Sequence, residues 1–380
     1  MTAAAFRIAV LPGDGIGVEV VAAGLAALDA LAASTPGLAF DWQHLPGGAR
    51  HYLETGTAFS DESMRALETC DAILFGAMGL PDVRLANGTE IAPQLDIREH
   101  FELYAGVRPI RVMPNTPAVL ANPRAKDIDL VILREQTEGF FHSRGKADIE
   151  HDGANDHSRI TRKGAERLFD FAFRLARRRK AAGHPGIVTC VDKSNVLTSM
   201  AYMRGIFDER AKLNPDLEAD HCYVDAMALN LVRQPWVYDV IVTENLFGDI
   251  LSDLGGGLAG GMGLAPSGDI GDRHAMFQPA HGSAPDIAGK GIANPTAMLL
   301  SCAMMLEWLG EQHGDASASA AGHRLDAAVL RVYGEGRVRP FEFGGKDGTT
   351  AITRAVLKSI EEEPISIEGQ EPMPAAAPVR

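Results

Sequence analysis

Short apolar runs recur along the chain, and each of them ends at polar residues. They occupy residues 6–11, 72–75, 128–133, 186–191 and 238–242. Runs of this length that are rich in Val, Ile and Leu are typical of strands buried on both faces. Longer stretches with helical periodicity lie between them, for example at residues 19–32, 60–69 and 162–180. This alternation predicts an α/β protein with a largely parallel sheet.

Charged side chains follow three of the apolar runs. Arg134, Lys193 and Glu244 stand where predicted strands end. Ligands of parallel sheets gather at the carboxyl ends of the strands. An arginine there can hold a carboxylate through two hydrogen bonds, and a lysine in a partly dry site can act as a base. Each of these residues, taken singly, also fits an ordinary surface charge. The pattern of all three gives the hypothesis of an anion site.

The charge balance narrows the class of partner. The chain has 36 Lys and Arg against 50 Asp and Glu, a formal net charge of −14. This surplus excludes nucleic acid as the main partner, because phosphate binding needs clustered cations. It allows a small anionic substrate, which a few local arginines can hold. The four cysteines are widely spaced, which predicts reduced thiols rather than a disulfide framework or a zinc site.

Three further segments bear on location and order. Residues 1–10 lack the charged start and apolar core of a signal peptide, and no apolar run approaches the roughly 20 residues of a membrane span. We therefore expect a cytoplasmic protein with no membrane partner. The polar segment 144–158 predicts a loop or an extended arm. The residues after Glu363 are rich in Pro, Ala and Glu, which predicts a poorly ordered tail.

Asp249 and Asp253 form a candidate metal site. In a helix their i, i+4 spacing places both carboxylates on one face, where their like charges repel. A hard cation such as Mg²⁺ or Mn²⁺ between carboxylate oxygens relieves that repulsion. A solvated helix face explains the same pair equally well.

Glycine-rich segments are abundant, but none of them predicts a Rossmann fold. Residues 11–19 join a predicted strand to a helix with the spacing GxGxG, which can let backbone N–H groups approach a cofactor. A GxGxxG pattern from Gly255 to Gly260 follows a helix instead of a strand, so it is better explained as a helix end. The long polar loop at 281–295 is of a kind that is often functional.

Five segments, taken in their order along the chain, resemble the β-decarboxylating dehydrogenases. This family acts on isocitrate, 3-isopropylmalate, homoisocitrate, tartrate or D-malate. The segments are residues 12–17, 191–197, 223–228, 245–254 and 281–289. The resemblance extends from Leu11 to about Thr350. It implies an isopropylmalate-dehydrogenase-like two-domain fold, which is not a Rossmann fold. The implied domains are residues 1–103 with 260–363 for the cofactor, and 104–259 for substrate, metal and dimer contact, with an arm near 142–160 and a tail at 364–380.

The resemblance also implies the roles of individual residues. The substrate carboxylates would be held by Arg98, Arg108 and Arg134. Lys193 would take the proton from the C2 hydroxyl, and the metal ligands would be Asp225, Asp249 and Asp253. The family builds each site from two subunits, with the lysine and the first aspartate lent by the partner. A homodimer with shared active sites is therefore implied.

A cofactor loop follows from the same resemblance. Its residues are His281, Gly282, Ser283, Ala284 and Asp286, with Asn294 at the adenine. An acidic residue at the position of Asp286 accompanies NAD in the family. The physical reason agrees, because a carboxylate can accept from the ribose hydroxyl and repels a 2′-phosphate.

Three positions depart from the family pattern. Phe141 stands where the family has a catalytic tyrosine, and phenylalanine donates no proton, so His142 or water would have to replace it. Gln278 stands where the family has a Glu on the cofactor side of the site. Gln94 occupies the substrate-selecting position, and Ala92 stands where isocitrate enzymes have Ser. Gln94 favours a polar or small C3 substituent.

The sequence thus predicts NAD-dependent, Mg²⁺- or Mn²⁺-dependent oxidative decarboxylation of a malate-type, 3-substituted 2-hydroxy acid, in the 3-isopropylmalate, tartrate and D-malate class. Isocitrate or homoisocitrate remains an alternative substrate. Phe141 motivates a second alternative, a dehydrogenase that does not decarboxylate. A non-catalytic family subunit is the third alternative, and the complete set of lysine, aspartates and arginines argues against it.

Overall fold

The chain leaves one compact unit and later returns to it. In the computed structural model, which describes residues 5–362, one unit contains residues up to Pro93 and from Met276 on, and the other contains Gln94–Ala275. The sequence placed these divisions at 103 and 259, and both positions lie inside the second unit. Residues 268–270 belong to the second unit because they pair with residues 105–107 of the same sheet. The tail expected at 364–380 lies outside the described residues.

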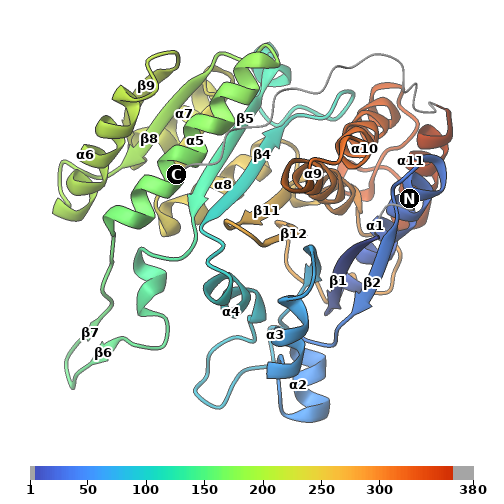
Figure 1. Cartoon of the computed structure of the whole chain (residues 1–380), viewed down its shortest axis with the longest axis horizontal. Coiled ribbons are helices and arrows are strands. Elements are labelled where there is room, and N and C mark those ends of the chain that lie inside the picture. Colours follow the sequence, from blue (N-terminus) through green and yellow to red (C-terminus); the bar gives the residue numbers. More distant parts are fainter. Residues whose placement is uncertain (1–4, 363–380) are drawn as a thin grey trace. The chain divides into compact units, whose positions relative to one another are not determined.

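The first unit is built on parallel strands in the order β2-β1-β3-β12 (Figure 1). The strands are β1 (Phe6–Gly13), β2 (Phe40–His44), β3 (Ala72–Ala77) and β12 (Ala275–Pro279). All six residues of β3 are buried, as expected of a strand covered on both faces. The helices of this unit are α1 (Gly17–Ser34), α2 (Ala49–Thr55), α3 (Asp61–Leu67), α9 (Thr296–His313), α10 (Ala316–Gly334) and α11 (Thr349–Glu362).

Helix α1 qualifies as a membrane span by length and composition, and it is the one such helix among residues 5–362. No membrane span was expected from the sequence. Its buried face includes Val20, Leu28 and Leu31 and packs against β1, β3, α9 and α11. A core helix of a folded domain passes the same test as a span, so its packing explains its apolar composition.

The second unit is built on strands in the order β11-β4-β5-β10-β8-β9. They are β4 (Ala105–Arg111), β5 (Asp129–Glu135), β8 (Ile187–Asp192), β9 (Glu218–Tyr223), β10 (Val240–Thr243) and β11 (Pro266–Ile270). Only β4 runs antiparallel to its neighbours in this set. The predicted α/β fold with a largely parallel sheet is confirmed.

Helices cover the strands of the second unit. The helices of the unit are α4 (Pro93–His100), α5 (Arg162–Ala181), α6 (Thr198–Lys212), α7 (Val224–Arg233) and α8 (Asn245–Leu258). Figure 1 shows α5 in front of the strands and α7 and α8 behind them. Behind the strands, Leu251 of α8 and Met227 of α7 pack on Ile132 and Ile241. This packing fixes the side of α8 that faces the ends of β4 and β5.

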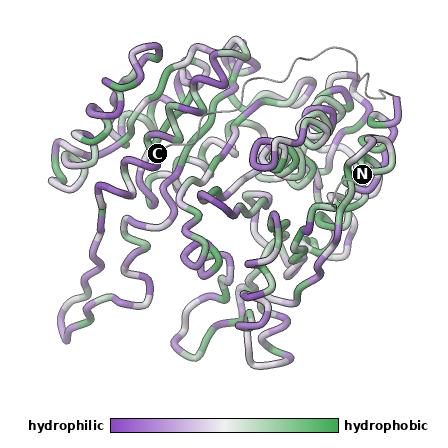
Figure 2. Tube along the Cα trace, viewed as in Figure 1, coloured by the Kyte–Doolittle hydropathy of each residue, from purple (hydrophilic) through white to green (hydrophobic). Residues whose placement is uncertain are grey.

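A short antiparallel hairpin projects from the second unit. Its strands are β6 (Asp148–Ile149) and β7 (Ala154–Asn155), and they pair with each other only in the described chain. Figure 2 shows that most of the hairpin is hydrophilic. Ile149 is 80% exposed and is its clear exception.

Candidate active site

Three arginines from different elements lie together in the second unit. Arg98 comes from α4, Arg108 from β4 and Arg134 from the end of β5, and all three are buried. Burial, together with the charges of Arg98 and Arg108, lowers the pKa of the Arg134 guanidinium to about 10. Burial also lowers the pKa of Arg108. Cations this close in a dry site need negative charge beside them, and a buried acid supplies part of it here.

Asp269 of β11 is the buried acid beside Arg98 and Arg108. Its carboxylate accepts from Arg98 Nε at 2.9 Å and from Arg108 Nη2 at 3.3 Å. Gln136 Nε2 also donates to it, at 2.7 Å. Asp269 has no exposed surface, and although burial opposes ionisation, the two arginines hold its pKa below the usual range. Sequence reasoning missed this residue, which lies 171 positions from Arg98.

Arg134 is held by the first turns of α8. Asn245 Oδ1 accepts from Arg134 Nε at 3.0 Å and from Nη2 at 2.7 Å, while Arg134 Nη1 donates to Asp249. Asn245 Nδ2 donates to the Glu138 carbonyl at 3.0 Å, which fixes the amide orientation. Gly248 allows the close approach, because a Cβ there would lie 2.6 Å from Arg134 Cγ. Asn245 was part of a recognised segment, but its role was not predicted.

Asp249 and Asp253 occupy α8 with the predicted i, i+4 spacing. Partial burial and the charge of Asp249 raise the pKa of Asp253, and Arg108 and Arg134 oppose that rise. The repulsion inferred from the sequence is therefore present. A divalent cation is the natural partner of such a pair.

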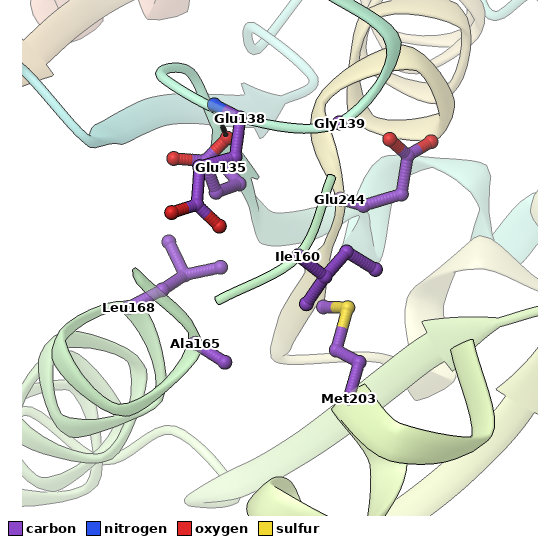
Figure 3. Close-up of a pocket in the computed structure, with 8 residues that line it drawn as sticks. All are labelled: Glu135, Glu138, Gly139, Ile160, Ala165, Leu168, Met203 and Glu244. Carbon is purple, nitrogen blue, oxygen red and sulfur yellow. Dashed lines mark hydrogen bonds between the residues drawn. The ribbon is translucent and has the colours of Figure 1, made fainter. Parts of the chain in front are cut away.

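Helix α8 begins at a buried carboxylate. Glu244 accepts from the backbone N–H groups of Phe247 at 2.7 Å and Leu246 at 3.1 Å, which caps the helix. Burial raises the pKa of Glu244. Figure 3 shows Glu244 on one side of a small cavity, with Glu135 and Glu138 together on the other. This cap orients the helix that carries Asp249 and Asp253.

Lys193 and Asp225 form a separate pair. Lys193 follows β8, Asp225 lies in the first turn of α7, and Lys193 Nζ donates to Asp225 Oδ1 at 2.5 Å. This contact lowers the pKa of Asp225. Neighbouring Asp192 is fully buried and bonded to Arg204 Nε at 2.7 Å and Nη2 at 2.9 Å, which anchors the strand end.

One chain does not bring together all three predicted metal ligands. Within residues 5–362, no group of three His, Cys, Asp or Glu side chains is placed to hold a metal ion. Asp249 and Asp253 are neighbours on α8, whereas Asp225 pairs with Lys193. The side chain of Asp225 is 66% exposed, so it is available to another molecule.

Phe141 lies against the arginine cluster. It belongs to the short helix η2 (Phe140–Ser143), and the Arg134 guanidinium carbon lies 5.1 Å from its ring centroid. The ring therefore lies next to Arg134, at the position where the family tyrosine was expected. It contributes a cation–π contact and no acidic hydroxyl.

The predicted cofactor loop lies in the first unit, against the glycine-rich turn after β1. Ile16 N donates to the Ser283 carbonyl at 2.8 Å, and Ser283 Oγ donates to the Gly79 carbonyl at 2.5 Å. Gly15 has φ +57°, and a Cβ there would lie 1.9 Å from the Ser283 carbonyl oxygen. The glycine spacing thus serves close packing of the turn on the loop.

The remaining predicted cofactor residues differ in their surroundings. Asp286 and Gly282 are exposed, and Ala284 adopts φ +36°. His281 Nδ1 lies 2.9 Å from the Gly282 carbonyl, Nε2 has no partner in the described chain, and burial lowers the pKa of the ring. Asn294 Oδ1 accepts from Thr296 N at 3.1 Å, and its Nδ2 donates to Glu342 at 2.6 Å. Asn294 therefore also supports the start of α9.

Two of the departures from the family pattern are glutamines, one buried and one partly buried. Gln278 lies on β12 and is 7% exposed. Gln94 Oε1 is buried and has no hydrogen-bond partner among the described residues. A buried acceptor without a partner is costly, so this atom is a natural contact for a ligand donor.

Comparison with known proteins identifies the family of the chain. Residues 7–360 match the isocitrate/isopropylmalate dehydrogenase family. A 3-isopropylmalate/3-methylmalate dehydrogenase of Methanocaldococcus jannaschii is 41% identical, covering 94% of this chain and 99% of the relative. A tartrate dehydrogenase/decarboxylase of Pseudomonas putida is 39% identical, covering 95% and 99%.

A solved structure extends the likeness to the fold. The crystal structure of isocitrate dehydrogenase from Methylococcus capsulatus matches with a TM-score of 0.80 and 34% identity, covering 93% of this chain and 99% of that one. The family generally uses NAD(P) and a divalent metal. The chain belongs to the isocitrate/isopropylmalate dehydrogenase family and is an NAD(P)-dependent oxidative decarboxylase.

Proposed function

We propose that the protein oxidises and decarboxylates a malate-type, 3-substituted 2-hydroxy acid, in the 3-isopropylmalate, tartrate and D-malate class, with NAD and Mg²⁺ or Mn²⁺. The observation that carries the proposal is the group of three buried arginines beside the two carboxylates of α8. The arginines hold the substrate carboxylates and fix the orientation of C2 and C3. Lys193 accepts the proton of the C2 hydroxyl.

The residues present fit a divalent metal. Asp249 and Asp253 repel each other on α8, and both supply hard oxygen ligands. Asp225 of a partner subunit would complete the set. When bound, the ion polarises the C2 oxygen and stabilises the negative charge that develops there as CO₂ leaves. The task of Arg98, Arg108 and Arg134 is to keep the leaving carboxylate aligned.

A homodimer follows from the same residues, because one chain separates Lys193 and Asp225 from Asp249 and Asp253. The helices that carry the aspartates also expose apolar side chains, with Leu229 at 54%, Val232 at 49% and Ile250 at 60%. Because α7 and α8 pack together, these side chains supply a surface for a second copy.

Hybrid dimers test this arrangement. Lys193→Ala and Asp249→Asn subunits are each inactive alone, and their mixture regains activity, because one site of each hybrid then carries both wild-type residues. Sites built within one chain would leave the mixture inactive. Mixing Lys193→Ala with wild type at the same ratio gives the control for dilution.

Asp286 supports NAD as the cofactor. It is exposed on the loop at 281–289, where its charge disfavours a 2′-phosphate. The ratio of kcat/KM for NAD to that for NADP tests this choice. We expect NAD to be preferred, and Asp286→Lys to reduce the ratio. Equal use of both cofactors by the wild type would contradict the assignment.

The substrate is tested by NADH formation with Mn²⁺ and D-malate, tartrate, 3-isopropylmalate, isocitrate and homoisocitrate. The proposal predicts turnover of one of the first three compounds. Preferential turnover of isocitrate or homoisocitrate would replace the proposed substrate within the same reaction class. Phe141 favours one rival outcome, in which NADH forms while the keto acid accumulates without loss of CO₂.

A further inference from the structure

The group formed by Arg98, Arg108 and Arg134 includes a buried negative charge, that of Asp269. Binding of an anion does not need this charge. Asp269 is fully buried and contacts both Arg98 and Arg108. A structural ion pair of this kind balances one arginine against one acid. Here one carboxylate stands against two guanidinium groups, and Arg134 adds a third positive charge nearby. The cluster therefore retains two positive charges beyond what Asp269 neutralises.

An unpaired buried donor shows that this group of arginines is open to a ligand. Arg98 donates to Asp269 through Nε. Arg108 Nε is buried and has no partner in the described chain. A buried N–H without an acceptor carries a cost that a bound carboxylate removes. Two positive charges beside this open donor match an anion with two carboxylates.

We propose that Asp269 is a specificity-determining residue that restricts the anion site to substrates with two carboxylates and excludes those with three. This inference rests on the proposed function and names the residue that limits its substrate class. Asp269 acts through Arg98 and Arg108, so it is a positioning residue and does not take part in the chemistry. It fixes the direction of the Arg98 fork and removes one positive charge from the site.

Charge balance explains the exclusion. Arg98, Arg108 and Arg134 together with Asp269 leave two positive charges, and Asp249 and Asp253 are balanced separately by a divalent cation. A substrate with two negative charges therefore neutralises the two positive charges that remain. A third carboxylate finds no remaining positive charge in a site where an unpaired buried charge is costly.

The test compares Asp269→Asn with Asp239→Asn. Asp239 is a matched control, because it is equally buried in the same unit and pairs with Arg179 at 2.5 Å, outside the anion site. For each variant, kcat/KM is measured with isocitrate and with the best dicarboxylate. The rise in melting temperature with each anion is measured without NAD, in the presence of Mg²⁺.

Asp269→Asn is expected to shift the kcat/KM ratio toward isocitrate by about tenfold or more, because it removes a like charge from a buried contact. Isocitrate should also raise the melting temperature of Asp269→Asn by more than it raises that of the wild type. Asp239→Asn should change neither preference, whatever it does to stability. A folded Asp269→Asn protein with the wild-type ratio and the wild-type melting response would overturn the inference.

The wild type gives a second test if Asp269→Asn does not fold. At equal ionic strength, dicarboxylates should raise its melting temperature and tricarboxylates should not, and equal stabilisation by both would overturn the inference. The proposed function fails separately, if the wild type turns over no dicarboxylate with NAD or NADP. The melting response still decides the role of Asp269 in that case.

Discussion

The guanidinium of Arg134 lies over the ring of Phe141, with 5.1 Å between the guanidinium carbon and the ring centroid. The same guanidinium donates to Asn245 and Asp249 of α8. A substrate carboxylate bound by Arg134 would therefore lie near a ring that cannot deliver a proton. This contact makes protonation of the enol the expected weak step of the reaction.

Phe141→Tyr should raise the turnover rate. The new hydroxyl lies beside Arg134, where it can supply the proton that Phe141 lacks. We expect kcat to rise by about tenfold or more, since a positioned acid contributes factors of about 10² to 10⁴. The solvent deuterium isotope effect on kcat reports the proton transfer. Phe140→Tyr is the control one residue away, and an equal gain there, or none at Phe141, would refute the explanation.

Asn245→Ala should weaken substrate binding more than cofactor binding. Asn245 accepts two hydrogen bonds from Arg134, and its loss leaves the guanidinium held on this helix by Asp249 alone. We expect KM for the substrate to rise by about tenfold, because each hydrogen bond to a charged group contributes about 1.5–3 kcal/mol. KM for NAD should stay the same. Asn214→Ala removes an acceptor of Arg177 on the protein surface and should change neither constant.

Lys193→Ala should abolish turnover without unfolding the protein. Lys193 is partly exposed and pairs with Asp225, so its removal leaves no buried charge behind. We expect kcat to fall by about 10³, in the range measured for general bases. Lys163→Ala, at an exposed position on α5, controls for loss of a positive charge. Near-normal turnover of Lys193→Ala would exclude the lysine as the base.

Glu244 should make stability depend on pH. Burial raises its pKa above the usual 4.5, so its contribution to stability is complete below that pH and is lost as pH rises through the folded pKa. Glu244→Gln keeps an acceptor for the helix cap and cannot ionise. The variant's free energy of unfolding, minus that of the wild type, should therefore increase from pH 4 to pH 8, which means that the variant gains stability relative to the wild type. Urea denaturation across this range measures the difference, with exposed Glu54→Gln as the baseline.

The sequence predicted local features well, because local patterns determine them. The run at 128–133 became β5, with Arg134 near its end, and the pattern at 162–180 became α5. Asp249 and Asp253 could be placed on one helix face from their spacing alone. The family segments correctly indicated an NAD(P)-dependent oxidative decarboxylase.

Contacts between distant segments were not predictable in the same way. Asp269 meets Arg98 only because β11 pairs with β4, and no local pattern marks that meeting. The same pairing moved the boundary of the second unit away from residue 259. Asn245 was visible within a segment, but its contact with Arg134 depends on how α8 packs on β5.

The proposed reaction couples hydride transfer to loss of CO₂, and it is tested with the best dicarboxylate deuterated at C2. We expect the deuterium to appear on the reduced nicotinamide and one CO₂ to be released for each NADH formed. Deuterated NADH without CO₂, with accumulation of the keto acid, would contradict decarboxylation and identify a simple dehydrogenase.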